Sequence, residues 1–459
     1  MTADIKSYPA YKDSGVPWLG KVPEHWNVKR NKLFLREVNQ RSEDGTEELL
    51  TVSQYTGVTR RRERSLGEGD LLTHATSLVG HKRVGPGDLV VNIMLAWNGS
   101  LGVSSLAGIV SPAYCVYRAG PQSEPRFLHY LYRTPLFTGA FKTVSTGVVD
   151  SRLRLYPDVF FGMSSLLPPF PEQASIVRYL DHADRKVRHA IRARQQLIKL
   201  LTEQKQAIIQ RAVTRGLDPN VRLKPSGVSW LGDVPEHWQV TRLARVVRNS
   251  NAGEVIDKGW WGRGKEVLYT CARDPFQSDY PNFPARKRTT GIDLLVTRNG
   301  TPYVHRPVAD ALYSNVVQRI NLVPGSNRQY VALSLEEAAR SMKGYGVSIE
   351  SLNYDMWKQL VLVVPPPVEQ AAIVQYVDAT TVTLDKAIYA ARREIDLLRE
   401  YRTRLIADVV TGKLDVRDVT VPADETDAMP EELESIDDVE AIDQTDDAVE
   451  ADSGAEENA

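Results

Sequence analysis

The sequence predicts a protein with an internal pseudo-two-fold duplication, in which two α/β (α+β) modules are joined by two long antiparallel coiled-coil helices. Three observations predict this fold. The phrase SGVPWLGKVPEHW at Ser14 returns as SGVSWLGDVPEHW at Ser226, with 11 of 13 positions identical. The phrase PPFPEQASIVRYLD at Pro168 returns as PPPVEQAAIVQYVD at Pro365. Each second phrase also opens a long apolar stripe at helical spacing, and a repeat of this length is the first guide to architecture.

The helices are predicted over residues 168–217 and 365–415, where apolar residues step by alternating fours and threes. The predicted seam positions are Val187, Ile191, Arg194, Ile198, Leu201, Lys205, Ile208 and Ala212 in the first copy, and Leu384, Ile388, Ala391, Ile395, Leu398, Arg402, Leu405 and Val409 in the second. Prolines precede each helix and a glycine ends it, at Gly216 and Gly412. Each helix is then about 40 residues or 60 Å long. An antiparallel pairing is expected because a whole module separates the two helices.

One basic residue interrupts each seam at matching places, Lys205 and Arg402. A polar seam residue can fix the register of a coiled coil at a cost in stability. Alternatively, the long stem can carry the charge out of the interface into water. The sequence leaves both interpretations open.

The segments between the repeated phrases predict modules with many short strands. Gly87–Val91 and Ile292–Val296 each indicate a turn that enters a buried strand, and they are expected to be counterparts. Outside the repeated phrases the similarity between the two segments is faint. The shared phrases therefore resemble a framework, and the segments between them differ.

Length and composition agree with this organisation. A chain of 459 residues with 42% hydrophobic content is long enough for about two to four domains. Its two cysteines, Cys115 and Cys271, are far apart, so neither a disulfide framework nor a cysteine zinc site is expected. The first residues lack an apolar signal segment, and no apolar run is long enough for a membrane span. We expect a soluble cytoplasmic protein.

The net charge of −1 conceals a strong polarity. From Val421 to the end there are 16 Asp and Glu residues and no Lys or Arg, which leaves residues 1–420 with a net charge of +15. A basic body favours a polyanionic partner. A merely basic protein with a solubilising tail would have the same composition.

Motifs for catalysis are missing from the sequence. We find no phosphate-binding loop, dinucleotide fingerprint, methyltransferase motif, nuclease motif or histidine metal spacing. Glu24–His25 and Glu236–His237 resemble acid–base pairs, but adjacent residues in a turn rarely converge on one substrate. The tryptophans of the repeated phrase are expected to pack each module onto the framework: Trp18, Trp26, Trp230 and Trp238. We expect no catalytic residue and no metal ligand on this chain.

Cationic and aromatic residues remain as candidates for DNA contacts, since Arg and Lys neutralise phosphates and Arg reads guanine in the major groove. The candidates in the first module are Arg60, Arg61, Arg62, Lys82, Arg83, Trp97 and Asn98. Those in the second are Trp260, Arg263, Lys265, Arg286, Lys287, Arg288, Arg298 and Asn299. The simpler alternatives are solvated charges, tryptophans in a core, and Asn-Gly dipeptides that only form hairpin turns.

The chain resembles specificity subunits of type I restriction–modification systems. The resemblance is carried by the SGVPWLG and VPEHW phrases that open each half, the GDLVVNIMLAWNGSLG and DLLVTRNGT strands, and the PPFPEQ and PPPVEQ helix entries. It covers residues 14–416. It implies target-recognition domains at 1–167 and 218–364 and conserved spacer helices at 168–217 and 365–415. The acidic tail at 416–459 departs from the family pattern, and its composition predicts that it is disordered.

The resemblance also implies function and partners. Each target-recognition domain would read one half of a bipartite, asymmetric site in double-stranded DNA. Two modification subunits, which carry S-adenosylmethionine and methylate adenine, would bind equivalent framework surfaces. Restriction subunits would use ATP and Mg²⁺ for translocation and cleavage. The chain itself would be non-catalytic and would carry no cofactor.

Two alternatives stay open at the level of sequence. A scaffold that assembles other proteins without reading DNA would also use repeated helices, although its body would have no need of a large positive charge. An enzyme with an unrecognised site would need turnover by the purified chain. The tail either competes with DNA for the basic modules or only keeps the protein soluble.

Overall fold

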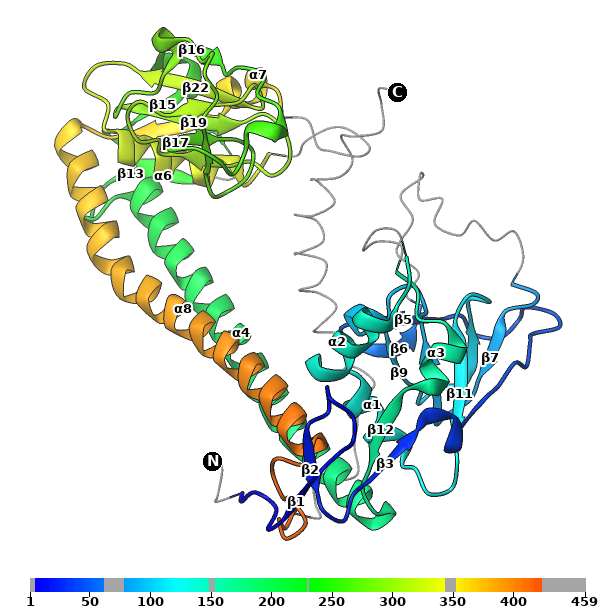
Figure 1. Cartoon of the computed structure of the whole chain (residues 1–459). Helices are drawn as coiled ribbons and strands as arrows, with labels where there is room; N and C mark the ends of the chain where they lie inside the picture. Colours follow the sequence, from blue (N-terminus) through cyan, green and yellow to red (C-terminus); the bar gives the residue numbers. More distant parts are fainter. Residues whose placement is uncertain (1–4, 62–77, 148–152, 229–230, 343–351, 423–459) are drawn as a thin grey trace. The chain divides into compact units, whose positions relative to one another are not determined.

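The computed structural model describes residues 5–61, 78–147, 153–228, 231–342 and 352–422. It divides into two compact units, one made of residues 1–193 with 395–459 and the other of residues 194–394. Each unit contains one β-rich module and one half of each long helix (Figure 1). The duplication predicted from the repeated phrases is therefore a duplication of structure.

The first module is organised around a four-stranded antiparallel sheet in the order β4-β11-β8-β9. Shorter two-stranded ladders flank it: β1-β2, β12-β3, β5-β6 and β10-β7. Its strands are β1 (Tyr11–Asp13), β2 (Lys21–Pro23), β3 (Asn27–Arg30), β4 (Leu35–Glu37), β5 (Leu50–Ser53), β6 (Gly57–Arg60), β7 (Lys82–Val84), β8 (Asp88–Val91), β9 (Leu101–Val103), β10 (Gly108–Val110), β11 (Cys115–Ala119) and β12 (Ser164–Leu167). Its helices are η1 (Asn31–Leu33), η2 (Ala96–Asn98), α1 (Pro125–Tyr132), α2 (Pro135–Val144) and α3 (Pro157–Gly162).

The second module repeats this plan with a four-stranded sheet in the order β16-β22-β19-β20. Its other sheets are β13-β14, β15-β23 and a three-stranded sheet, β18-β17-β21. Its strands are β13 (Leu223–Pro225), β14 (Asp233–Pro235), β15 (Gln239–Arg242), β16 (Val247–Ala252), β17 (Glu266–Tyr269), β18 (Phe276–Ser278), β19 (Asp293–Thr297), β20 (Val304–His305), β21 (Leu312–Tyr313), β22 (Val317–Leu322) and β23 (Val361–Val364). Its helices are α5 (Leu243–Val246), η4 (Lys258–Trp260), η5 (Ala285–Lys287), α6 (Arg328–Ala339) and α7 (Tyr354–Gln359).

The predicted counterpart strands occupy the same place in the two sheets. β8 and β19 are both interior strands with every residue buried, and each begins with a buried aspartate. Asp88 accepts two hydrogen bonds from Arg118, at 2.7 and 2.8 Å, whereas Asp293 accepts one from Asn321 at 2.9 Å. These hydrogen bonds to Asp88, together with its negative charge, raise the pKa of the Arg118 guanidinium. The modules thus share a framework sheet but satisfy its buried carboxylates differently.

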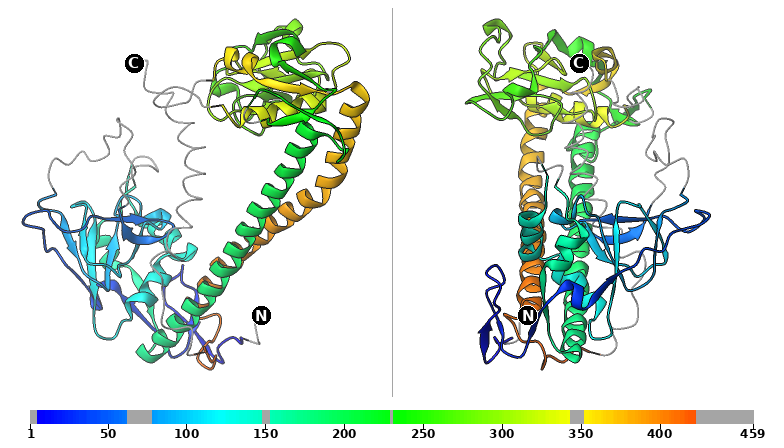
Figure 2. Two further views of the ribbon diagram at one scale, coloured as in Figure 1. Left: turned by 180° about the vertical axis from the view of Figure 1, so that it is seen from behind. Right: turned by 45° about the vertical axis from the view of Figure 1, so that its right-hand side comes forward.

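The two long helices are confirmed as α4 (Phe170–Arg215, 46 residues) and α8 (Pro367–Val410, 44 residues). At about 1.5 Å per residue each is about 65–70 Å long. Within each unit the two helix segments pack antiparallel, and Figures 1 and 2 show them side by side. Every predicted seam position is buried or half-buried, which confirms the predicted apolar stripe.

The two basic seam residues both form ion pairs with the other helix. Lys205 Nζ lies 2.6 Å from Asp385 Oδ1, and the Arg402 guanidinium pairs with Asp184. Burial opposes ionisation of Asp184, yet Arg402 and Arg188 hold the pKa of its carboxyl below the usual value. Because a specific carboxylate faces each cation, these contacts favour the register-fixing interpretation over a charge that only reaches water.

Glycine ends both helices, as predicted. Gly216 and Gly412 have φ angles of 74° and 78°, the left-handed conformation that disfavours residues with a Cβ. At Gly412 the Lys413 N–H then donates to the Asp408 carbonyl at 2.8 Å and closes the helix end. The turn also brings the chain back to its beginning, since the Tyr11 hydroxyl donates to the Gly412 carbonyl at 3.1 Å.

Gly412→Ala is expected to destabilise the first unit by about 1–3 kcal/mol, because the left-handed backbone and a crowded site both oppose a side chain. An added Cβ would clash with the Pro23 ring and lie 3.2 Å from Trp26. Gly139→Ala is the matched control. Gly139 lies on α2 with nothing within 4 Å of an added Cβ, so alanine should stabilise by about 0.5–1 kcal/mol. Thermal unfolding of both variants measures this; equal melting temperatures would contradict the prediction.

Three other predictions concern the cysteines, membrane-spanning helices and the acidic tail. Cys115 and Cys271 are free thiols, in agreement with the absence of a disulfide framework. In the part of the chain that the structure describes, the helices are too polar or too short for a membrane span. Most of the acidic tail, from residue 423 onward, lies outside the described residues, and its expected disorder stays a prediction.

Candidate nucleic-acid interface

The two repeated phrases meet at one carboxylate in the first unit. Glu172, at the start of α4, is 6% exposed. It accepts hydrogen bonds from the Trp26 indole at 2.9 Å and the Tyr8 hydroxyl at 2.7 Å, both at Oε1, and His25 Nε2 lies 2.7 Å from Oε2. Burial and the bond to Glu172 raise the pKa of Tyr8. The glutamate therefore fastens the start of the module to the start of the helix.

The second unit repeats this junction in a more open form. Glu369 accepts a hydrogen bond from the Trp238 indole at 2.9 Å, and His237 Nε2 lies 2.8 Å from its other oxygen. The Glu369 side chain is 41% exposed, compared with 6% for Glu172. The junction is thus one motif used twice, with different burial.

The glutamine that follows each glutamate makes a matching contact. Gln173 accepts a hydrogen bond from the backbone N–H of Glu124 at 2.8 Å, and Gln370 accepts one from Asn327 at 2.9 Å. Glu124 and Asn327 are the N-cap residues of α1 and α6. The Glu-Gln pair at the start of each long helix therefore contacts two parts of its module. The glutamate binds the His-Trp pair of the first repeated phrase, and the glutamine binds the N-cap residue of α1 or α6.

These contacts explain the repeated histidines and tryptophans. His25 and His237 pair with the glutamate of the other repeated phrase, and not with the glutamate beside them in sequence. Trp26 and Trp238 are 0% and 1% exposed, which confirms that they pack each module onto the framework. Trp18 is half-buried with its ring 5.0 Å from Phe137, and Trp230 lies outside the described residues.

Two basic candidates of the first module pair with two adjacent glutamates. Arg60 Nε lies 3.1 Å from Glu48, and Arg83 Nε lies 2.6 Å from Glu47. The two arginine side chains are 55% and 49% exposed. Exposed ion pairs of this kind are worth about 0–1 kcal/mol, so they can give way to phosphate contacts.

The remaining candidates of the first module have more local roles. Lys82 is buried, with Nζ 3.4 Å from Glu37. Trp97 donates to the Met94 carbonyl at 3.0 Å, and Asn98 accepts two hydrogen bonds from Ser100 within the turn that joins β8 to β9. Arg61 is exposed at the end of β6, and Arg62 lies outside the described residues.

In the second module, the basic residues at the end of η5 pair with glutamates from two other segments. Arg288 pairs with Glu266 at 2.7 Å, and Lys287 pairs with Glu254 at 2.5 Å. Arg319 donates to the carbonyls of both Lys287 and Arg288, at 3.0 and 2.8 Å. These bonds fasten η5 to the sheets, so Lys287 and Arg288 help to build the surface.

Three further candidates project from this surface. Arg263, Lys265 and Arg286 are exposed. The Arg263 guanidinium lies 5.6 Å from the centre of the half-buried Trp260 ring, a cation–π arrangement. Within the described part of the chain, the side chains of Lys265 and Arg286 make no hydrogen bond or ion pair. Their charges are therefore available to a ligand.

Arg298 and Asn299 follow β19 and are half-buried. Arg298 donates to the Asn315 carbonyl at 3.1 Å, while its Nε is buried without a partner among the described residues. Both residues therefore lie at the end of a strand, and their contact with DNA stays a prediction.

Sequence reasoning missed two kinds of residue. Glu172 and Glu369 belong to the helix entries PPFPEQ and PPPVEQ, and their recurrence at the same place in both phrases was a usable signal. Arg319 has no such signal, because its role depends on strand pairing between β22 and β16 and on the position of η5.

Comparison with known proteins gives a consistent result for the fold. No protein-family model and no curated protein matches the chain. A chain described under "Structural basis underlying complex assembly and conformational transition of the type I R-M system" matches at 15% identity, covering 86% of this chain and 99% of that one, with a TM-score of 0.61.

Two more solved structures have lower TM-scores. The HsdS subunit from Thermoanaerobacter tengcongensis is 16% identical over 86% of this chain and 98% of that one, with a TM-score of 0.41. The type I restriction–modification S subunit from M. genitalium is 11% identical over 84% and 96%, with a TM-score of 0.34. Over 86% of its length, the chain has the same fold as the matched chain of the type I R-M system, the structure with the TM-score of 0.61.

Proposed function

We propose that the chain is the sequence-specific DNA-recognition subunit of a type I restriction–modification complex, reading a bipartite asymmetric site. One observation carries the proposal: the same framework occurs twice and repeats its junction contacts, while the exposed basic residues of the two modules differ. A duplicated framework with different surfaces suits a target with two unlike halves. A scaffold that binds other proteins has no need of this difference.

The proposal divides the chain by task. Residues 1–167 and 218–364 act as two target-recognition domains, and residues 168–217 and 365–415 act as the spacer helices between them. Each domain contacts one half-site of double-stranded DNA. Since base edges carry sequence information and phosphates do not, the exposed cations serve mainly to position each domain, and loops reach the bases.

In the first module Arg60 and Arg83 are suited to phosphate contacts, because each is exposed and its ion pair with a glutamate is one that DNA phosphates can replace. In the second module Arg263, Lys265 and Arg286 are suited to the same task. The Trp260 ring beside Arg263 restricts the guanidinium and favours a directed contact.

The framework helices are proposed to bind two modification subunits through equivalent surfaces. Leu200 on α4 and Leu397 on α8 occupy matching positions of the repeat, 197 residues apart, and are 55% and 48% exposed. Exposed leucines at equivalent positions suit two copies of one partner. S-adenosylmethionine is expected on these partners, and ATP with Mg²⁺ on restriction subunits, so that this chain acts without catalysis and in the cytoplasm.

Footprinting of the chain assembled with its modification subunits tests the proposal. We expect protection of two short half-sites with a fixed gap on one DNA sequence. A variant complex carrying Arg263→Ala, Lys265→Ala and Arg286→Ala should lose protection at one half-site before the other. Uniform binding to all sequences, or no binding by an assembled complex, would favour the scaffold.

A further inference from the structure

A hollow of about 280 Å³ lies in the second unit, where the repeated phrase meets the start of α8. Its wall contains the three residues of the second junction, His237, Trp238 and Glu369. Asp218, beyond the end of α4, and Ala372 on α8 also line it. We call it the junction hollow. A cavity of roughly 150 Å³ accepts benzene, so the junction hollow has room for an aromatic ring.

In the first unit, the ring of Tyr8 stands at the matching junction. The centre of this ring lies 5.7 Å from the ring centre of His25 and 5.7 Å from that of Trp26. The Tyr8 hydroxyl donates to Glu172 at 2.7 Å, and Tyr8 is 3% exposed. These three contact residues are the first-unit counterparts of the histidine, tryptophan and glutamate that line the junction hollow.

The second unit has a different residue at the position of this tyrosine. The repeat aligns Tyr8 with Asn220, and the β1–β2 and β13–β14 ladders keep this alignment, because they have the same register. Asn220 is exposed and does not line the junction hollow. This difference accounts for the exposure of the two glutamate side chains, which is 41% at Glu369 and 6% at Glu172.

The segment that fills the first-unit junction also makes a main-chain contact. The Asp415 N–H donates to the Lys6 carbonyl at 2.8 Å. Asp218 is the counterpart of Asp415, and its N–H donates to no carbonyl within the described part of the chain. Leu217 beside it is 43% exposed, whereas its counterpart Leu414 is half-buried. An extended peptide can meet both the open donor and the apolar side chain, and a free phenol cannot.

We propose that the junction hollow is a docking site for a tyrosine side chain that a partner protein presents on an extended segment. The ring packs against His237 and Trp238, and its hydroxyl donates to Glu369. The carbonyl two residues before the tyrosine accepts from the Asp218 N–H. In the first unit Tyr8 supplies the same contacts from within the chain. This protein contact is independent of DNA readout.

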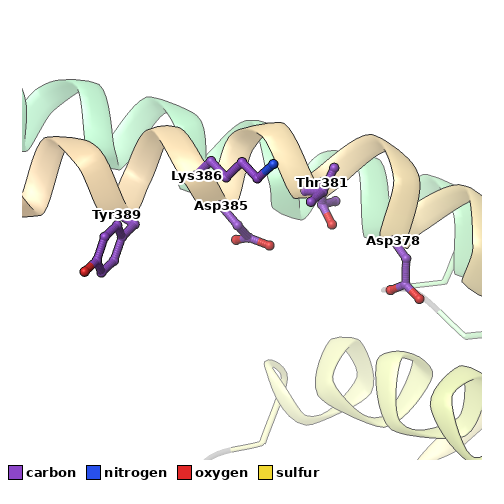
Figure 3. A pocket seen from close by; sticks show the side chains of 6 residues that line it. Asp378, Thr381, Asp385, Lys386 and Tyr389 are labelled. Carbon is purple, nitrogen blue, oxygen red and sulfur yellow. The ribbon is translucent and has the colours of Figure 1, made fainter.

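Another hollow of the second unit, of about 480 Å³, has a different construction. The described residues that line it all belong to α8, among them Asp378, Asp385 and Tyr389, whose side chains project on the same side of the helix (Figure 3). It shares no described lining residue with the junction hollow. A ligand bound there leaves the Trp238 indole unaffected, so the indole distinguishes the two hollows.

The first experiment titrates the full-length chain with p-cresol, which is the tyrosine side chain without its backbone, and with toluene as the matched control. NMR follows the Trp238 indole N–H, which donates to Glu369 at 2.9 Å. We expect p-cresol to shift this signal. Toluene should bind about fivefold more weakly, because it lacks the hydroxyl. A peptide of residues 5–11, which contains Tyr8, should bind more tightly than p-cresol, because it adds the main-chain bond.

Ala372→Phe tests the site from the protein side, because it fills the junction hollow from α8. Ala371→Phe is the matched control, since Ala371 is an exposed neighbour on the same helix that does not line the hollow. Asn220→Tyr is a second test variant, which supplies the ring from within the chain as Tyr8 does in the first unit. Both test variants should lose the shift caused by p-cresol, and Ala371→Phe should keep it. Thermal melting confirms that each variant is folded.

The proposal is overturned if p-cresol leaves the Trp238 signal unchanged, or if both filled variants bind p-cresol like Ala371→Phe. A peptide that binds no more tightly than p-cresol would overturn it in favour of a free phenol. A dimer in light scattering, held by exchange of residues 5–13 between two copies, would overturn it in favour of self-association. The assays contain no DNA, so their failure is distinguishable from failure of the proposed function.

Discussion

Glu172→Ala is expected to destabilise the first unit by about 2–6 kcal/mol. Glu172 is the shared acceptor of the Trp26 indole and the Tyr8 hydroxyl, and both donors belong to buried residues. Removing the carboxylate leaves both donors without a partner, and each such group costs about 1–3 kcal/mol. Hydrogen exchange of the first unit, with calorimetry of the whole chain, measures the loss.

Glu369→Ala supplies the matched comparison, because Glu369 makes the equivalent contacts at a 41% exposed side chain. Water can replace a lost acceptor there, so we expect a loss of about 1 kcal/mol. The faster exchange should be confined to the unit that carries the substitution. If the two variants lose equal stability, the junction does not owe its strength to burial.

The combined substitution Arg263→Ala, Lys265→Ala and Arg286→Ala is expected to lower affinity for DNA of any sequence about 100-fold at 0.1 M salt. Each phosphate contact contributes about 0.9 to the salt slope, so three contacts contribute up to about 2.7. Protein stability should hardly change, because these exposed side chains make no ion pair in the described part of the chain. Fluorescence anisotropy over a salt series measures both quantities.

Arg288→Ala is the contrasting variant. Arg288 pairs with Glu266 at 2.7 Å and donates to the Asp310 carbonyl at 2.8 Å, so its loss should lower the melting temperature. The structure thus distinguishes the exposed Arg263 from the ion-paired Arg288, which the sequence could not do. Should the triple variant keep the wild-type salt slope, these cations do not face DNA.

The framework could be predicted from sequence because its signals are local and repeated. The helix seams, the glycine ends at Gly216 and Gly412, and the strand openings at Asp88 and Asp293 all follow from short-range rules of periodicity and backbone freedom. Recurrence of each signal in the second half of the chain removed much of the ambiguity of any single one.

The surface could not be predicted in the same way. Lys287 and Arg286 are adjacent in a basic run, yet Lys287 pairs with Glu254, while Arg286 is exposed. The difference depends on which strand packs beside η5. That is a contact between residues distant in the sequence, and local sequence patterns do not predict it.

A map of methylated adenines in the source cells, with the gene intact, deleted, or with residues 218–364 replaced by those of another specificity subunit, tests the central claim most directly. The account predicts a split motif that disappears on deletion and changes in one half only on replacement. A motif that survives deletion, or one that changes in both halves, would contradict it.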